Sequence, residues 1–401
     1  MMRRGWKWTA GGAEATRRHG AGQPRRGGRA DNRDGPVTDL DLDLDPNFPG
    51  ARTTVGNMSF HEQQSKKRKT TDNGGRQERI SANPSALSSP IYGGRHWTVS
   101  VAIPASVITS LATADQRLAV PGRIARALAI FSVDEVVIFD DTPLTQRPRH
   151  TDPAAYTGDT DPCHFLAHVI SFLEAPPFMR KALFPLHPNL RQTALLPTLD
   201  MPHHPNPREW IPYREGVTLP GKTSSGAGTL VEIGLEEPIE VEETIPPKTR
   251  LTLLFPEDES KPPTVVHPAA PREEGGYYWG YTVRRASSLS NVFTESPYEE
   301  GYDISIGTSE RGTPISRAFP SSTPRPINFN HMLIAFGGPR GLEFAAMNDE
   351  QLNGIGIQGP KTRELFDHWI DVLPNQGSRT IKTEEALFIG LTALRSLWET
   401  S

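Results

Sequence analysis

The chain has 401 residues, 36% of them hydrophobic and 22% charged, with a formal net charge of −4. Its one cysteine, Cys163, excludes an internal disulfide and a cysteine-rich zinc site, and fits a reducing compartment. No apolar run approaches the ~20 residues that a membrane-spanning helix needs, and the first residues lack the apolar stretch of a secretory signal. We therefore expect no membrane contact and no secretion.

Residues 1–93 are predicted to form a disordered basic tail, because they are rich in Gly, Arg, Asp and Ser and show no sustained periodicity. Residues 1–95 carry a net charge of +7, whereas the remaining 306 residues carry −11. The basic cluster 66–69 is typical of a nuclear localisation signal or a nucleic-acid tether, with a solvated charge run in a linker as the alternative. We expect a nuclear protein, with nucleolar and cytoplasmic fractions left open.

Folded structure is predicted to begin near Trp97. Residues 98–104 alternate as a strand does, and 136–139 read as a buried strand. Between them Pro121 suits the first turn of a helix, and a second helix is predicted over about 161–173. Strands that alternate with helices predict an α/β fold with a parallel sheet. The apolar stripe of the first helix would consist of Ile124, Ala127, Leu128 and Phe131.

From about residue 205 the pattern changes to short β-prone runs separated by Gly and Pro turns, which favours a small barrel. Six glutamates crowd residues 232–243, where phosphate would be repelled. Four aromatic residues at 277–281 could stack bases, although alternating aromatics on a strand are more often core. The runs predicted as strands are 216–219, 229–233, 239–242, 251–255 and 277–284.

Three segments in the last 100 residues combine small-residue turns with hydroxyl side chains. Residues 304–312 and 331–343 each read as a short apolar strand that ends in a loop, and 374–386 lead from a turn into a helix. Thr383 is the predicted N-cap of that helix, which continues through Trp398 at helical spacing. Because ligands of open parallel sheets bind at the carboxyl ends of the strands, we expect these loops to form one pocket.

These three segments resemble the cofactor loops of SPOUT methyltransferases, trefoil-knotted α/β enzymes that use S-adenosylmethionine. The resemblance is greatest to the eukaryotic and archaeal branch of RNA methyltransferases that includes the human spindle- and kinetochore-associated member, and it covers roughly residues 95–398. The N-terminal half contributes to it through residues 97–104, 122–131, 133–140 and 278–284.

The resemblance implies a knotted parallel sheet with helices on both faces and an inserted OB-like β-barrel. The first part of the methyltransferase domain would span 94–205, the barrel 206–290, and the second part, with the cofactor-binding knot, 291–401.

The resemblance also implies where S-adenosylmethionine binds, and no metal is expected. Glycines in these loops would permit close approach of the backbone to the ligand, with simple turn chemistry as the alternative. The implied cofactor-binding residues are Gly307, Thr308, Gly337, Gly338, Gly341, Leu342, Gln376, Gly377, Ser378, Thr380 and Ile381.

Arg126 is the candidate catalytic residue. In ribose-methylating SPOUT enzymes the catalytic arginine follows a glycine by four residues, as Arg126 follows Gly122. Val120 stands where those enzymes have asparagine, which puts ribose chemistry in doubt. A guanidinium could hold a phosphate or stabilise negative charge on the acceptor, with a surface arginine of an amphipathic helix as the alternative.

Residues 379–386 resemble the segment that closes the cofactor site in bacterial ribosomal uridine N3-methyltransferases, and Arg379, Thr383, Glu384 and Ala386 agree with it. A base nitrogen, such as uridine N3, is therefore the favoured acceptor. Its proton must be removed, and Glu310 and Glu384 are the nearest carboxylates, unless they are simply a loop charge and a helix start.

The predicted function is methylation of a structured RNA, such as rRNA, by a homodimer in which Arg126 of one subunit serves the other subunit's pocket. The alternative is a non-catalytic RNA-binding or assembly factor for the ribosome or the spindle that retains the fold. Two other features are interpreted as structural. Asp140 and Asp141 read as a solvated strand end rather than a magnesium site, and His203 and His204 lack the partners of a zinc site.

Overall fold

The computed structural model describes residues 94–399, apart from 148–149, 205–210, 222, 224–227, 257 and 259–260. The predicted tail and its basic cluster at 66–69 lie outside the described residues. Among those described, no helix has the length and apolar character needed to cross a bilayer.

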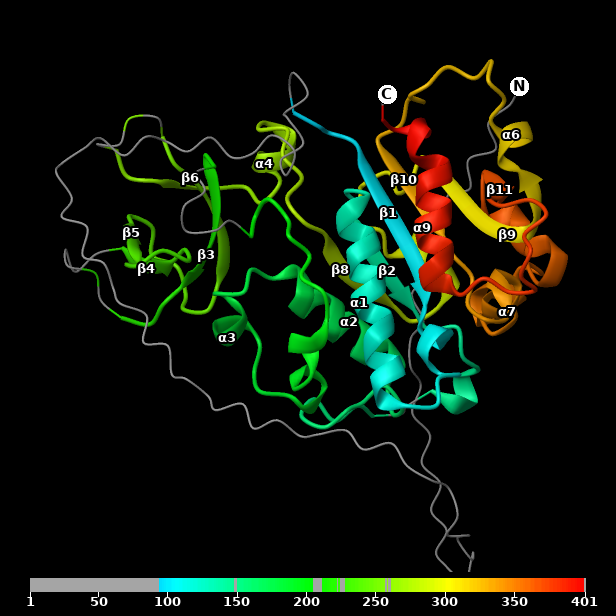
Figure 1. The fold of residues 1–401 in the computed structure, drawn as a ribbon, viewed down its shortest axis with the longest axis horizontal. Helices are drawn as coiled ribbons and strands as arrows, with labels where there is room; N and C mark the ends of the chain where they lie inside the picture. The colour runs from blue at the N-terminus through cyan, green and yellow to red at the C-terminus, as the bar shows by residue number, and fades with distance from the viewer. Residues whose placement is uncertain are drawn as a thin grey trace, which may run out of the picture. The chain divides into compact units, whose positions relative to one another are not determined.

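The main element is a six-stranded sheet in the order β11-β9-β10-β1-β2-β8 (Figure 1). All five neighbouring pairs are parallel, which confirms the predicted parallel sheet. Its strands are β1 (Thr98–Pro104), β2 (Glu135–Phe139), β8 (Thr282–Ala286), β9 (Ile304–Pro314), β10 (His331–Ala335) and β11 (His368–Asp371).

Helices cover both faces of this sheet, as a parallel sheet with apolar residues on both sides requires. Successive residues of β1 point to opposite faces, so that Val101 enters one core and Ala102 the other. The first core holds α1 (Ala114–Ile130), α2 (Pro162–Glu174) and α9 (Thr383–Leu394), and α1 and α9 lie side by side (Figure 1). The second holds α5 (Leu289–Thr294), α7 (Gly341–Met347) and α8 (Glu350–Gly354).

Short helices occupy several connections. They are η1 (Ala105–Ile108), η2 (Leu144–Gln146), α3 (Arg180–Leu183), η3 (Pro188–Leu190), η4 (Thr193–Leu195), α4 (Ala270–Glu273), α6 (Ile315–Ala318), η5 (Gly359–Leu365) and η6 (Arg395–Leu397).

The start of α1 differs from the prediction. The helix begins at Ala114, and Pro121 lies inside it rather than in its first turn. A capping box explains the earlier start, because the Thr113 hydroxyl accepts from the Gln116 N–H and the Gln116 side chain accepts from the Thr113 N–H. The predicted stripe is confirmed, since all four of its residues are buried.

A second sheet has five short antiparallel strands in the order β5-β4-β3-β6-β7. The four predicted runs between 216 and 255 correspond to β3, β4, β5 and β6, and β7 was not predicted. The sheet has its own small apolar core, which includes Val231 and Leu253. Its strands are β3 (Tyr213–Thr218), β4 (Thr229–Glu232), β5 (Ile239–Val241), β6 (Arg250–Leu254) and β7 (Thr264–Val266).

The prediction that 277–284 forms a further strand of this second sheet is wrong. The strand β8 begins at Thr282 and pairs with β2 in the parallel sheet. Tyr278 and Tyr281 are buried in the core of that sheet, and their hydroxyls donate to the carbonyls of Val133 and Ile170 at 3.0 and 3.2 Å. These two aromatics are therefore core residues and cannot stack on RNA bases.

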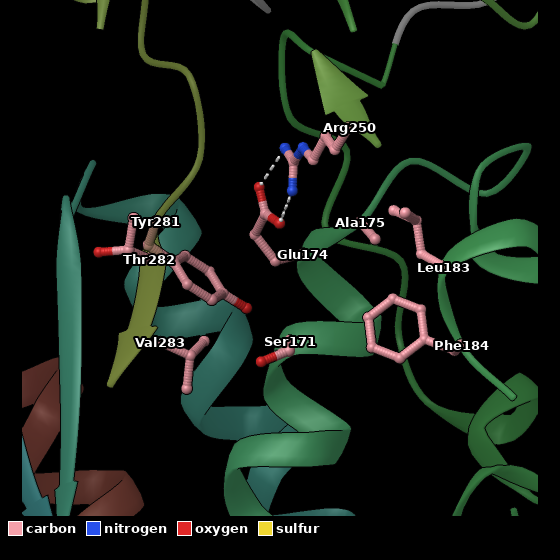
Figure 2. A pocket seen from close by; sticks show the side chains of 9 residues that line it. All are labelled: Ser171, Glu174, Ala175, Leu183, Phe184, Arg250, Tyr281, Thr282 and Val283. Carbon is pink, nitrogen blue, oxygen red and sulfur yellow. Dashed lines mark hydrogen bonds and ion pairs between the residues drawn. The ribbon is translucent and has the colours of Figure 1, made fainter. Parts of the chain in front are cut away.

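A buried ion-pair network joins the end of α2 to the second sheet. Both guanidinium Nη atoms of Arg250 donate to Glu174, at 2.6 and 3.0 Å (Figure 2). Its Nε donates to Glu215 at 2.6 Å. A cavity of about 240 Å³ lies beside this pair, and Phe184 and Tyr281 are among the residues that line it (Figure 2). His203 Nε2 lies 2.9 Å from Oε1 of Glu174.

The network sets the ionisation of Glu174. Burial alone would raise the pKa of this carboxyl, but the charge of Arg250 and the hydrogen bond from His203 outweigh it and lower the pKa from 4.5 to about 2. Because the folded-state pKa is the lower one, the stabilisation is present above pH 4.5 and is lost as the pH falls toward 2.

We expect Arg250→Ala to lower the free energy of unfolding by about 3–5 kcal/mol, because it leaves Glu174 buried without a counter-charge. The matched control is Arg395→Ala, which removes an arginine whose pair with Glu399 lies on the surface and should cost less than about 1 kcal/mol. Urea unfolding at pH 7 measures both. Equal costs would show that the buried network contributes no more than a surface pair.

Candidate active site

The carboxyl ends of β10 and β1 lie next to one another, and the first part of β9 lies on the other side of β10. In the parallel ladders Ala335 of β10 pairs with Gly307 of β9 on one side and with Ala102 of β1 on the other. After β1 the chain continues to β2, whereas after β10 it continues to β11 on the opposite side of the sheet. The boundary between β1 and β10 is therefore a topological switch point, where connections diverge and leave room for a ligand.

The first predicted cofactor loop is an excursion within β9, which continues to Pro314 rather than ending at 312. Gly307 pairs with Trp369 of β11, but the next residue of β11, Ile370, pairs with Thr313, so residues 308–312 leave the ladder. The Thr308 hydroxyl donates to the Ala335 carbonyl at 3.0 Å and ties this excursion to the end of β10.

The second loop leads from β10 into α7 through a tight turn. The Gly341 N–H donates to the Gly338 carbonyl at 2.9 Å, and Gly341 has a φ of +77°. A Cβ on Gly338 would lie 2.4 Å from Oγ of Ser106, so the backbone of this loop presses against the residues that follow β1. Leu342, predicted to bind the cofactor, has its side chain in the apolar core instead.

The third loop precedes α9, and its polar groups bond mainly within the loop. The Gln376 side chain donates to the Ser378 carbonyl at 3.0 Å, and the Ser378 hydroxyl donates to the Thr380 carbonyl at 2.9 Å. A Cβ on Gly377 would meet no atom within 4 Å, so this backbone is open to its surroundings. Thr380 is exposed and Ile381 is half-buried.

Thr383 connects the third loop to the second. Its hydroxyl donates to the Gly337 carbonyl at 2.9 Å, and the helix N-cap is Lys382, whose N–H is accepted by Glu385 at 3.0 Å. The prediction that Thr383 caps α9 is therefore wrong, because its side chain spans two segments instead. Hydrogen bonds from Thr308 and Thr383 thus hold the ends of all three loops together at one edge of the sheet.

The hydrogen bonds of Arg126 are to a segment outside these loops. Its Nη1 donates to the carbonyls of Thr198 and Leu199 at 3.1 and 2.8 Å. Arg123, one helical turn earlier, pairs instead with Glu384 at the start of α9, at 3.4 Å. The side chain of Arg123 is 58% exposed and that of Glu384 only 5%. Glu384, a candidate general base, is thus already paired, while Glu310, the other candidate, is exposed.

A pair that the sequence analysis missed lies at the same edge. Asp141 follows β2 and is 1% exposed, and its two carboxylate oxygens accept the N–H and the hydroxyl of Ser106 at 3.0 and 2.5 Å. Burial raises the pKa of this carboxyl, and the hydrogen bonds from Ser106 oppose that rise. The interpretation of Asp141 as a solvated strand end is wrong. Polar residues just after two adjacent strands were the signal that could have found the pair.

The remaining candidate groups have structural partners. Both His203 and His204 bond to the carbonyl oxygen of Glu174 through Nε2, and burial raises the pKa of the Cys163 thiol to about 12, which keeps it in the unreactive protonated form. Within the part of the chain that the structure describes, no group of three His, Cys, Asp or Glu side chains could hold a metal ion.

Comparison with known proteins relates the chain to a family of enzymes. A family model described as "Putative RNA methyltransferase" matches residues 98–394. A Drosophila melanogaster protein named 28S rRNA (uridine-N(3))-methyltransferase is 43% identical over 309 residues, which are 74% of this chain and 62% of that protein. Human and mouse proteins of the same name are each 39% identical over 75% of this chain, which covers 79% and 77% of their lengths. The match thus spans less than two thirds of the fly protein.

We expect Gly338→Ala to lower the free energy of unfolding by about 1–3 kcal/mol, because the added Cβ would overlap Oγ of Ser106. The control is Gly377→Ala, where the Cβ meets open space and the change should stay within about 1 kcal/mol. Chemical unfolding of both variants provides the comparison. A neutral Gly338→Ala would mean that the second loop does not press against Ser106 in solution.

Proposed function

Because the chain belongs to the RNA methyltransferase family matched over residues 98–394, we propose that it transfers a methyl group from S-adenosylmethionine to N3 of a uridine in rRNA. The named activity of the fly, human and mouse relatives supports the acceptor. The observation that carries the proposal is the pair of hydrogen bonds, Thr308 to Ala335 and Thr383 to Gly337, that gathers three loops at the switch point of the sheet.

The residues present fit a cofactor with an adenine and a carboxylate. Gly337 and Gly338 are half-buried and have no side chain beyond the backbone, and main-chain amides match the edge of an adenine. The open backbone at Gly377 and the hydroxyls of Ser378 and Thr380 would face the rest of the ligand. The sulfonium of the bound cofactor supplies the methyl group. The protein's contribution is to hold the acceptor nitrogen in line with it, which accounts for most of the rate in such a displacement.

Arg126 acts on the acceptor side as part of a homodimer. Within one protomer its guanidinium bonds to the carbonyls of Thr198 and Leu199, so a role at the cofactor loops requires the partner subunit's loops. The apolar side chains of Ile130 at the end of α1 and of Leu195, 46% and 81% exposed, support a subunit interface near this helix.

The finer fold assignment is a SPOUT-type knot with an OB-like insertion. Residues 336–367 place α7 and α8 on one face of the sheet, and 372–382 then lead past the carboxyl ends of the strands to α9 on the other face. This crossing supports a threaded chain. Five short antiparallel strands around a separate apolar core support the OB-like assignment.

The target lies in the nucleus, where the basic cluster at 66–69 directs the chain and tethers RNA.

One observation favours a rival function, a non-catalytic assembly factor for the ribosome or the spindle. The 306 residues after 95 carry a net charge of −11, which repels RNA phosphates rather than attracting them.

We expect the purified full-length chain to bind S-adenosylmethionine in calorimetry and to transfer a labelled methyl group to a large-subunit rRNA fragment. Replacing the accepting uridine by N3-methyluridine should abolish transfer, because the acceptor atom is then blocked. Gly377→Arg should abolish binding of the cofactor, since a guanidinium near a sulfonium repels it, whereas Gly377→Ala should bind normally. Saturable cofactor binding with no transfer to any rRNA fragment would favour the assembly factor.

Mixed dimers test the role of Arg126. We expect Arg126→Lys to lower turnover about 100-fold or more, with cofactor affinity within about twofold of the unaltered chain, because lysine loses the planar fork of donors. Arg123→Lys, on the same helix, should keep most of the turnover. Co-expression of Arg126→Lys with Gly377→Arg should restore activity, since one site of each mixed dimer then has both an intact pocket and the partner's Arg126. No recovery in isolated mixed dimers would place the arginine in its own subunit's site or outside the reaction.

A further inference from the structure

A buried carboxylate that has no basic partner among the described residues lies where the proposed cofactor loops meet the sheet. Asp141 follows β2 and Ser106 follows β1, and these strands pair so that Pro104 faces Phe139 at their carboxyl ends. The two carboxylate oxygens of Asp141 accept hydrogen bonds from one residue, Ser106. Its N–H donates to one oxygen at 3.0 Å and its hydroxyl donates to the other at 2.5 Å. The pair therefore closes a ring between the two strand ends.

The burial of the Asp141 carboxylate disfavours folding, so stability does not explain its presence. Asp141 is 1% exposed, and among the described residues no Lys, Arg or His forms an ion pair with it. Buried charges in proteins are usually paired, because removal of an unpaired charge from water is strongly unfavourable. Burial accordingly raises the pKa of this carboxyl. Groups with such perturbed ionisation gather at functional sites more often than elsewhere.

The pair touches the proposed cofactor loop directly. A Cβ on Gly338 would lie 2.4 Å from Oγ of Ser106 and 3.4 Å from Oδ2 of Asp141, so the main chain of this loop rests on the pair. The Asn348 side chain, just after α7, donates to the carbonyl of Asp141 at 3.0 Å and to that of Phe344 at 3.1 Å. Ser106 and the main chain of Asp141 thus lie against the two ends of the segment that runs from β10 through α7.

We propose that Asp141 is a positioning residue for cofactor binding, which through Ser106 fixes the loop 336–341 in the shape that receives S-adenosylmethionine. The inference rests on the proposed function, which assigns this loop to the cofactor. Asp141 does not touch the ligand. It acts by fixing the position of the Gly337–Gly338 backbone relative to the end of β1. A shift of this backbone would move its donors and acceptors out of line with the adenine.

Three variants of the full chain separate positioning from general stability. Asp141→Ala removes the acceptors and should weaken binding of S-adenosylmethionine about tenfold in calorimetry. Asp141→Asn keeps the shape of the pair, because its oxygen accepts the Ser106 N–H and its amide donates to the hydroxyl, and should bind within about threefold of the unaltered chain. Ser106→Ala combined with Asp141→Ala should lose no more affinity than Asp141→Ala alone, since the two residues act as one unit.

The control is Asp303→Ala, at the opposite end of β10. Asp303 accepts the N–H groups of Asn330 and His331 at 2.8 and 2.6 Å, so its loss also removes two hydrogen bonds, yet it lies at the amino edge of the sheet. Thermal unfolding should shift in both alanine variants, whereas cofactor affinity, measured well below either transition, should fall only in Asp141→Ala. Equal affinity in Asp141→Ala and the unaltered chain would overturn the inference.

A readout that needs no cofactor distinguishes this inference from the proposed function. Hydrogen exchange of the amides at 337–342 should be faster in Asp141→Ala than in Asp303→Ala or the unaltered chain. If the unaltered chain binds no S-adenosylmethionine but exchange at 337–342 rises in Asp141→Ala alone, the assignment of the loop to the cofactor fails and the positioning of the loop stands. If exchange at 337–342 is the same in all three proteins, the positioning role is wrong whether or not the cofactor binds.

Discussion

The pairing of β1 with β10 is the contact on which the rest of the site depends. These strands lie side by side and parallel over five residue pairs, from Thr98 with His331 to Ala102 with Ala335. Their pairing brings the loop after β10 onto the residues after β1, and it creates the point at which the two halves of the sheet run apart. The proposed cofactor edge exists only because these distant segments are neighbours.

Two kinds of interaction hold the molecule together at different places. At the proposed site, neutral hydroxyl groups of Thr308, Thr383 and Ser106 donate to carbonyl or carboxylate oxygens. At the joint between α2 and the second sheet, the contacts are charged, with Arg250 shared between two glutamates. The hydroxyl contacts tie neighbouring segments together through neutral donors, whereas buried ion pairs penalise separation of the parts they join.

Much of the fold followed from local pattern. The apolar runs of β1, β2 and β10, the stripe of α1 and the apolar spacing of α9 could be read because burial and periodicity coincide there. The prediction that α9 continues through Trp398 is wrong, because the helix ends at Leu394 and η6 follows it. The start of α1 was missed because the capping signal at Thr113 lies eight residues before Pro121. The segment 277–284 was misplaced because its partner, β2, lies more than 140 residues away in the sequence.

The site was predictable as a set of loops but not as a set of contacts. Glycines and hydroxyls marked the three segments, yet the partner of each hydroxyl is set by tertiary packing. Asp140 and Asp141 illustrate the limit, since adjacent aspartates have opposite surroundings. Asp140 accepts from Thr142 in its own turn, whereas Asp141 is enclosed by Ser106, Gly338 and Asn348.

The contact between Thr98 of β1 and His331 of β10 spans 233 positions of the chain. At translation rates of 5–20 residues per second, a ribosome needs roughly 10–50 s between the synthesis of β1 and that of β10. During that interval the nascent β1 has no partner on its β10 side, so a chaperone has time to engage it before the proposed cofactor edge can assemble.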